Sequence, residues 1–147
     1  MAYDIRMGRA RDAQGIAQTV GEAFYGEFRQ LTRNPGRLAQ ALSGMVDLSR
    51  FAVGVNPETG SIEGAAALSD AAGYAVTARK DVLAKALGAV RGGLSFGVLR
   101  RELQRPERFS PGQAQVDFVA ARKRARGQGL AHDILAFLLS RGGYARY

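Results

Sequence analysis

Cysteine and tryptophan are absent from this chain of 147 residues, and histidine occurs only once. Without cysteine, neither a disulfide nor a thiolate metal site can form. One imidazole is too few for a histidine-rich metal centre. We therefore expect a protein that holds no metal.

Long apolar runs are also missing, because Arg, Lys or Gly interrupts each mostly apolar stretch. No membrane span of about 20 residues is therefore expected. The first residues, from Met1 to Arg6, carry charges where a signal peptide has an apolar run. The sequence indicates a cytoplasmic protein that does not enter a membrane.

Hydrophobic residues make up 46% of the chain and charged residues 23%, which favours a single packed domain over residues 1–147. The formal net charge is +8. Positive charge attracts anionic partners such as nucleic acid, an acidic membrane surface or a polyphosphate cofactor. It also serves solubility alone, so charge does not select a function.

Patterns in the first half predict a strand, two helices and a hairpin. Residues 5–7 read as a short strand. Asp12 can cap a helix with its carboxylate, and apolar residues follow it at helical spacing. Pro35 opens a second helix. A turn rich in Asn, Pro and Gly joins predicted strands at 50–55 and 61–68.

The stretch after the hairpin is less regular. Residues 71–78 are predicted to add an edge strand. An amphipathic helix is expected over 82–90, with its apolar stripe in the core or an interface. The glycines within 91–93 should break it, since an interior glycine costs about 1 kcal/mol relative to alanine. A second helical piece over 94–103 and a proline-containing loop over 104–112 should follow.

The last part of the sequence reads as strand, turn and helix. We expect the strand over 115–121 and the helix over about 129–139, stopped by the glycines at 142–143. Residues 144–147 look like a strand that has barely begun. The element order predicts an α/β (α+β layered) domain with a mainly antiparallel central sheet flanked by helices.

The informative motif is a glycine-containing turn, residues 126–131, that leads from a strand and a basic loop into a helix. The first N–H groups of a helix have no partner within it, and the helix dipole places positive charge there. Gly127 and Gly129 carry no Cβ, so an anion can approach the backbone closely. Such a helix start is suited to phosphate.

Two other phosphate-binding motifs fit this turn worse. The loop of nucleotide hydrolases needs a Gly-Lys pair, and the chain has none. The dinucleotide fingerprint needs a third glycine at position 132, which is His132.

The sequence Arg-Gly-Gln-Gly-Leu-Ala at 126–131, after a strand that ends Val119-Ala120-Ala121, resembles the Q/R-x-x-G-x-G/A signature of the GNAT superfamily of N-acetyltransferases. A second frame, 124–129, also satisfies the pattern, but the first places two small residues at the helix start. The N-terminal strand and helix are similar to those of the family as well, so the resemblance covers the whole chain.

This resemblance implies a function and a set of site residues. The family transfers an acetyl group from acetyl-CoA to a primary amine, which attacks the thioester directly in a ternary complex. A backbone N–H near Val119 to Ala121 would polarise the acetyl carbonyl, and Val119 and Ala121 would pair with the pantetheine arm. The pyrophosphate of coenzyme A would be held by the backbone amides of Arg126, Gly127, Gln128, Gly129, Leu130 and Ala131.

The family normally continues past the motif helix with a strand, a helix and two closing strands. This sequence stops at Tyr147, so we expect a domain that is incomplete at its C-terminus or that borrows the missing part from a partner. Tyr144 and Tyr147 come too early to be the tyrosine that often protonates the leaving thiolate. An exposed sheet edge would favour a homodimer.

Asp117 lies in the middle of the motif strand and is a candidate base for the incoming amine. Regular alternation places Asp117 with Gln115 and Val119 on one side of the strand, and Phe118 on the other. The alternative is a structural salt bridge at the sheet edge.

Glu63 on the hairpin is a second candidate for the catalytic carboxylate, although a solvent-facing strand residue is the simpler interpretation. Glu22 and Glu27 on the first helix could contact the acceptor amine. His132 follows the motif, where an exposed helix position is the simpler interpretation.

The basic loop offers Arg122, Lys123 and Arg124 as partners for the 3′-phosphate of coenzyme A, with a solvated loop as the alternative. Two other functions stay open from the sequence. One is a catalytically incomplete remnant that binds coenzyme A or serves as a scaffold. The other is a basic nucleic-acid-binding module, which an aromatic content of 8% and the absence of tryptophan make less probable.

Overall fold

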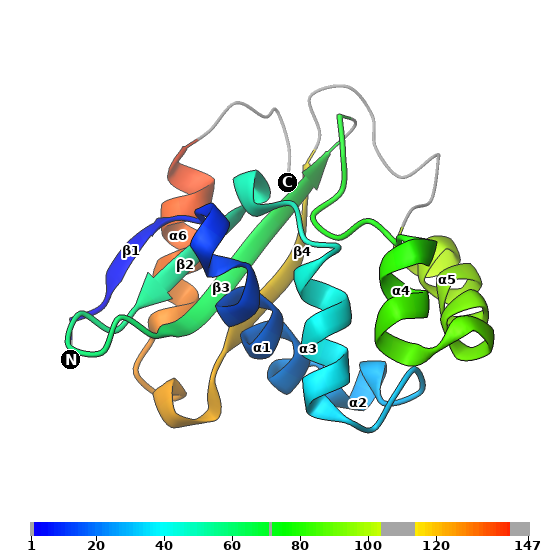
Figure 1. Cartoon of the computed structure of the whole chain (residues 1–147). Coiled ribbons are helices and arrows are strands. Elements are labelled where there is room, and N and C mark those ends of the chain that lie inside the picture. The colour runs from blue at the N-terminus through cyan, green and yellow to red at the C-terminus, as the bar shows by residue number, and fades with distance from the viewer. Residues whose placement is uncertain (1, 71, 104–113, 142–147) are drawn as a thin grey trace.

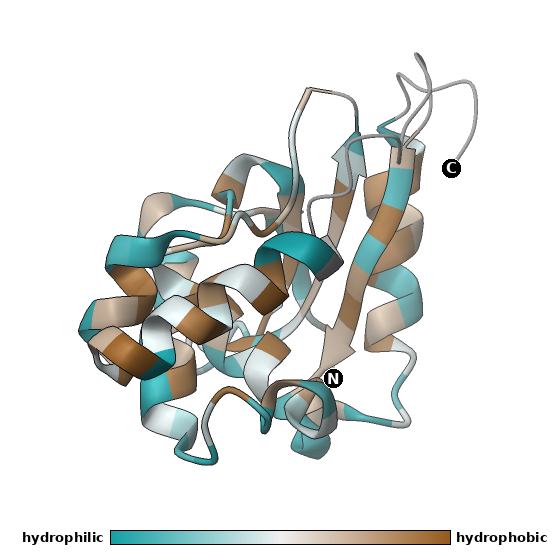
Figure 2. Ribbon diagram, turned by 90° about the vertical axis from the view of Figure 1, so that its right-hand side faces the viewer, coloured by the Kyte–Doolittle hydropathy of each residue, from teal (hydrophilic) through white to brown (hydrophobic). Residues whose placement is uncertain are grey.

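The computed structural model describes residues 2–70, 72–103 and 114–141. This part of the chain forms three layers, with a sheet in the middle (Figures 1 and 2). The helices between Ala13 and Leu103 (α1 to α5) lie on one side of the sheet, and the helix Leu130–Ser140 (α6) lies on the other. The predicted α/β class is therefore confirmed.

The sheet has four strands in the order β1-β2-β3-β4, and each neighbouring pair is antiparallel. Their bounds are Asp4–Met7, Phe51–Val55, Ile62–Asp70 and Ala114–Ala121. The predicted hairpin is confirmed as β2 and β3. Its turn is held by the side chain of Asn56, which accepts a hydrogen bond from the Glu58 N–H at 2.9 Å.

The larger core lies between the sheet and the helices α1 (Ala13–Ala23), α3 (Pro35–Ser43) and α4 (Lys80–Leu87). The short helix α2 (Tyr25–Phe28) continues α1. Pro35 opens α3 as predicted, and Asn34 caps that helix by accepting from the Arg37 N–H at 3.1 Å. Core members include Ile16, Val20, Leu38, Leu42, Phe51, Leu83 and Phe118.

The predicted cap at Asp12 is wrong. Its carboxylate makes no capping bond to α1. It accepts instead from the Arg6 guanidinium, at 2.6 Å and 3.1 Å, and from the Arg9 N–H at 2.7 Å. Burial raises the pKa of Asp12, but these hydrogen bonds outweigh burial and hold that pKa below its ordinary value.

The helical excursion breaks at a different glycine from the one predicted. The helix α4 ends at Gly88, which has φ of +92°, and α5 runs unbroken from Ala89 to Leu103. Gly92 lies inside α5, where an added Cβ would stand 2.6 Å from the Ala84 backbone. Its lack of a side chain lets the two helices approach closely. Val90, expected to face the core or an interface, is 79% exposed.

The edge strand predicted at 71–78 is wrong for its described part, 72–78. That segment has no strand and makes only isolated bridges, Val46 to Val76 and Asp70 to Gly73. The predicted loop at 104–112, the glycine stop at 142–143 and the nascent strand at 144–147 lie outside the described residues.

The helix α6 (Leu130–Ser140) covers the opposite face of the sheet and forms a second apolar cluster with it (Figure 2). It lies close because Gly54 and Gly64 face each other on β2 and β3. An added Cβ at Gly64 would stand 2.7 Å from the Ile134 side chain, and one at Gly54 would stand 2.6 Å from that of Leu130. These two glycines therefore seat the start of α6 on the sheet.

The middle of β3 has very small side chains. Ala65, Ala66 and Ala67 follow Gly64 and are each 0% exposed. Ala65 and Ala67 belong to the larger core, and Ala66 belongs to the cluster under α6. At the centre of β3, the bulky residues of both cores therefore come from the helices and the neighbouring strands, while Ile62 and Leu68 contribute near its two ends.

No helix among the described residues is both long and apolar enough to cross a membrane.

Candidate functional site

The glycine turn lies between the end of β4 and the start of α6, as predicted. A single turn of 3-10 helix, η3 (Lys123–Ala125), comes first, and Gly127 and Gly129 then take φ of +84° and +74°. Left-handed backbone of this kind favours glycine. Residues 126–129 are exposed, while Ala125 and Leu130 on either side are buried. Two apolar anchors thus fix an outward-facing loop.

The backbone N–H groups of the turn are available to a ligand. Those of residues 127–131 donate no hydrogen bond to any residue that the structure describes. An added Cβ at Gly127 or Gly129 would meet nothing within 4 Å, so the space beside them is open. The dipole of the helix that follows adds positive potential at the same place. The turn therefore has the donors and the space to bind an anion such as phosphate.

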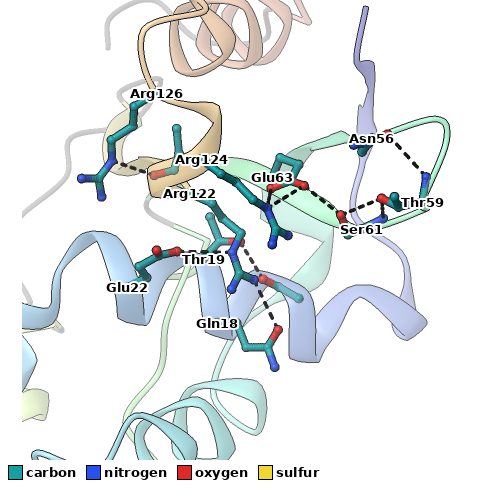
Figure 3. Close-up of polar contacts among 12 residues, drawn as sticks. Gln18, Thr19, Glu22, Asn56, Thr59, Ser61, Glu63, Arg122, Arg124 and Arg126 are labelled. Carbon is teal, nitrogen blue, oxygen red and sulfur yellow. Dashed lines mark hydrogen bonds and ion pairs between the residues drawn. The ribbon is translucent and has the colours of Figure 1, made fainter. Parts of the chain in front are cut away.

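Arg124 is held beside the turn by a buried carboxylate (Figure 3). Its Nε donates to both oxygens of Glu63, at 2.9 Å and 2.7 Å, and Ser61 Oγ donates to the same carboxylate at 2.9 Å. The side chain of Glu63 is 5% exposed and that of Arg124 is 60% exposed. Burial raises the pKa of Glu63, but the bonds from Arg124 and Ser61 outweigh it and leave that pKa below its ordinary value.

The other basic residues of the loop have different surroundings. Arg122 pairs with Glu22 at 3.3 Å, and its N–H donates to the Glu63 carbonyl at 2.7 Å. Arg126 Nε donates to the Ala121 carbonyl at 3.1 Å, which closes the turn on the end of β4 (Figure 3). Three of the loop arginines are therefore ordered by contacts inside the chain.

Tyr3 and His132 also lie near the turn. Tyr3 Oη donates to the side-chain oxygen of Gln128 at 3.2 Å, which ties the N-terminal segment to the turn. The sequence carried no signal for this contact, which spans 125 positions. The His132 side chain is 85% exposed and lies 3.7 Å from Asp133. This matches the simple interpretation of an exposed helix residue.

The strand β4 lies at one end of the sheet order, so Val119, Ala120 and Ala121 pair with β3 on one side only among the described strands. The backbone of such an edge strand can form hydrogen bonds with an extended ligand. This edge leads directly into the glycine turn.

A β-bulge interrupts β4 at Asp117. The pairing steps from Ala67 opposite Phe118 to Leu68 opposite Val116, which leaves Asp117 between them. The predicted alternation therefore fails here, because Asp117 and Phe118 line the same pocket. A bulge commonly re-aims a side chain in this way.

The carboxylate of Asp117 accepts a hydrogen bond from Ser69 Oγ. Ser69 is completely buried, and its oxygen accepts from the Ala75 N–H at 2.8 Å. Ser69 therefore holds the carboxylate of Asp117 in place from the buried side of the strand pair. Sequence reasoning missed Ser69, since a serine near the end of a strand gives no signal of its partner.

The two candidate carboxylates are far apart. Glu63 lies beside Arg122 at the turn end of the strand pair, whereas Asp117 lies about five residues further along β4. At a rise of about 3.3 Å per residue, this separates them by roughly 16 Å. The structure therefore places Glu63 with the phosphate turn and Asp117 with a separate pocket.

Comparison with known proteins gives matches at the level of structure. No protein-family model matches the sequence, and no curated protein matches it significantly. A structure from Corynebacterium glutamicum described as histone acetyltransferase HPA2 and related acetyltransferase matches with a TM-score of 0.61 and 20% identity. The match covers 99% of this chain and 75% of that one.

An N-acetyltransferase from Staphylococcus aureus Mu50 matches with a TM-score of 0.55 and 14% identity, over 95% of this chain and 76% of that one. A third structure, an acetyltransferase, has a TM-score of 0.53 and 18% identity, over 95% of this chain and 74% of that one. Two longer structures match with TM-scores of 0.46 and 0.48, and the chain spans 56% of each. The predicted GNAT-like fold is confirmed by the first three.

Proposed function

We propose that this chain, which has the GNAT fold, binds acetyl-CoA and transfers its acetyl group to a primary amine. The observation that carries the proposal is the exposed turn at 126–129 and the helix start that follows it, where the N–H groups of residues 127–131 have no partner among the described residues. The likeness to solved acetyltransferases supports it at the level of the fold.

The turn would hold the pyrophosphate by its backbone. Five consecutive N–H groups at the start of a helix have no partner among the described residues, and the space beside Gly127 and Gly129 is open. The exposed guanidinium of Arg124 adds a charged donor beside them, since both of its hydrogen bonds to Glu63 use Nε. The residues proposed for the cofactor are Val119, Ala120, Ala121, Arg124, Arg126, Gly127, Gln128, Gly129, Leu130 and Ala131.

The pantetheine arm would lie along the outer edge of β4. Backbone groups of Val119 and Ala121 would pair with it as a strand pairs, and an N–H in this segment would polarise the acetyl carbonyl. The edge runs from the turn toward Asp117, over about 13 Å at a rise of about 3.3 Å per residue. Acetyl-CoA would supply the thioester that the amine attacks: the nitrogen would bond to the acetyl carbon, the C–S bond would break, and coenzyme A would leave as a thiolate that takes up a proton.

Asp117 is assigned the proton transfer. An amine must lose its proton to attack, and a carboxylate within reach can accept that proton directly or through water. The bulge and Ser69 hold the Asp117 side chain toward a pocket that could admit the amine. Glu63 is the second candidate carboxylate from the sequence, but its contacts support a different role. We assign it the role of holding Arg124 beside the turn.

Calorimetric titration with acetyl-CoA tests the binding step. Gly129→Glu should weaken binding by at least about a hundredfold, because a carboxylate would stand beside the pyrophosphate. Gly60→Glu is the matched control, since Gly60 also has a positive φ of +76° and open space around it but lies in the hairpin turn. Equal losses in both variants, or near-normal affinity in Gly129→Glu, would contradict this placement of the cofactor.

Thermal unfolding and turnover complete the test. Acetyl-CoA at about 100 times its Kd should raise Tm by about 5–10 °C. Asp117→Asn should lower kcat by about 10²- to 10⁴-fold while acetyl-CoA affinity stays unchanged. Thiol release with a panel of amines separates a transferase from a protein that only binds coenzyme A. Binding without any amine-dependent release would leave the fold as a scaffold and refute the transferase.

A further inference from the structure

A pocket of about 490 Å³ lies between α2, α5 and the first half of β4. Its volume is in the range of small-molecule sites, about 300–1,000 Å³. It is separate from the glycine turn, none of whose residues lines it. Its lining consists of Phe24, Glu27, Phe28, Gln30, Leu31, Val98, Leu99, Gln115, Asp117 and Phe118.

The charge of this pocket is opposite to that of the chain. The chain carries a formal net charge of +8, yet the charged side chains among the described lining residues are Glu27 and Asp117. No lysine or arginine is among those lining residues. Two carboxylates facing a partly closed space favour a cation. The described lining therefore favours a cation over the anions that the net positive charge of the chain attracts.

The remaining walls are largely apolar. Phe24 packs edge-to-face on Phe118 with ring centroids 5.5 Å apart, and Phe28 and Leu31 are buried beside them. Val98 is 47% exposed, so it offers apolar surface at the mouth. Apolar walls favour a ligand with an apolar body and disfavour extra charges that they cannot hydrogen-bond.

The carboxylates stand at different depths. Glu27 is exposed, whereas Asp117 is half-buried and held by Ser69. The bulge brings Asp117 and the Phe118 ring to the same side, so a charge and an aromatic wall adjoin each other. A ligand with one ammonium group next to an aromatic or aliphatic body matches this arrangement.

We propose that this pocket is the acceptor site and that it takes a primary monoamine carried on an apolar, preferably aromatic, body. The inference rests on the proposed acetyl transfer and names its substrate class. Asp117 contacts the ammonium group and later takes its proton, while the three phenylalanines and Val98 surround the body. Glu27 at the mouth is a specificity-determining residue that favours cations. A polyamine fits worse, because its further ammonium groups would meet apolar walls.

Direct binding of four probes tests this class without the cofactor. Calorimetry should show phenethylamine binding at least about tenfold more tightly than phenethyl alcohol, which has the same ring but no charge. Hydrocinnamate, which reverses the charge, should not bind. Spermidine, which has several charges and no ring, should bind at least about tenfold more weakly than phenethylamine.

Two arginine variants on one helix locate the site. Val98→Arg places a positive charge at the mouth of the pocket and should raise the Kd and the KM for phenethylamine by about tenfold. Val90→Arg is the matched control, because Val90 is exposed on the same helix but does not line the pocket. It should leave both constants unchanged. Glu27→Gln should raise the KM about fivefold without changing acetyl-CoA affinity.

The outcomes separate this inference from the proposed function. If acetyl-CoA binds and spermidine or hydrocinnamate is preferred, the acceptor class is wrong and the cofactor site stands. If Val98→Arg and Val90→Arg change the Kd and the KM for phenethylamine to the same extent, the pocket is not the acceptor site. If phenethylamine binds with the expected selectivity but acetyl-CoA does not bind, the pocket is a cation site and the transferase proposal fails.

Discussion

Replacing Gly64 with alanine tests how the phosphate turn is seated on the sheet. The added Cβ would stand 2.7 Å from Ile134 Cδ1, whereas carbon atoms in contact are normally about 3.5–4 Å apart. It would also stand 3.1 Å from Leu130 Cδ2. Both side chains are buried and Leu130 is the first residue of α6, so we expect relief of the overlap to repack these side chains and shift the start of this helix.

The size of the effect follows from two opposing terms. Overpacking of this kind costs about 1–3 kcal/mol. Replacing glycine in a strand recovers about 0.5–1 kcal/mol of backbone entropy. The free energy of unfolding of Gly64→Ala should therefore fall by about 1–2 kcal/mol. Acetyl-CoA affinity should fall as well, because the amides of the turn move with α6.

Urea denaturation of a double-mutant cycle provides the measurement. Ile134→Val removes Cδ1 and alone should cost about 0.5–1.5 kcal/mol. Combined with Gly64→Ala it removes the closest overlap, so the double variant should be more stable than the sum of the two losses by about 1 kcal/mol. Acetyl-CoA affinity should recover with it. Losses that add within about 0.5 kcal/mol would refute the packing argument.

Two further predictions concern stability alone. The pKa values of Glu63 and Asp12 are lower in the folded chain than their ordinary values of 4.5 and 3.8, so folding is favoured while both carboxylates are ionised. The free energy of unfolding should therefore fall as the pH drops below about 4.5, and Glu63→Gln with Asp12→Asn should flatten this dependence in urea titrations at several pH values. Gly88→Ala should cost about 1–2 kcal/mol because of its positive φ, whereas Gly93→Ala, inside α5 and with open space around it, should gain up to about 1 kcal/mol. Thermal unfolding of the two variants tests these opposite effects. Equal shifts in Tm would contradict the helix break at Gly88.

Local chemistry was enough to predict much of the fold and the phosphate turn. The proline at the start of α3, the turn residues of the hairpin and the glycine spacing before α6 all act through neighbouring backbone. Gly127 and Gly129 were expected to leave room for an anion, and the space beside both is open in the structure. Their positive φ values were not part of that prediction. The sequence also indicated which strand precedes the turn.

What the sequence could not predict depends on contacts between distant residues. Asp12 has the chemistry of a cap, but Arg6 on β1 competes for its carboxylate. Gly92 reads as a helix breaker, yet its role is close packing against α4. The pairing of Arg124 with Glu63 spans 61 positions.

The bulge at Asp117 belongs to the same group. The bulge depends on the register between β3 and β4. A prediction from alternation along one strand assumes that the strand has no bulge. The direction of the candidate base, and with it the acceptor pocket, could therefore be found only in the structure.

The alanine run in the centre of the sheet restricts which substitutions the interior of this fold can accept. Residues 65–67 have almost no side-chain volume to lose, while helices on both faces leave no room for more. Changes of volume in the interior therefore have to be made in the larger residues around this run, which lie mainly on the helices and the neighbouring strands. Substitutions intended to reshape either apolar core should therefore be made outside residues 65–67, and this part of β3 should be kept unchanged.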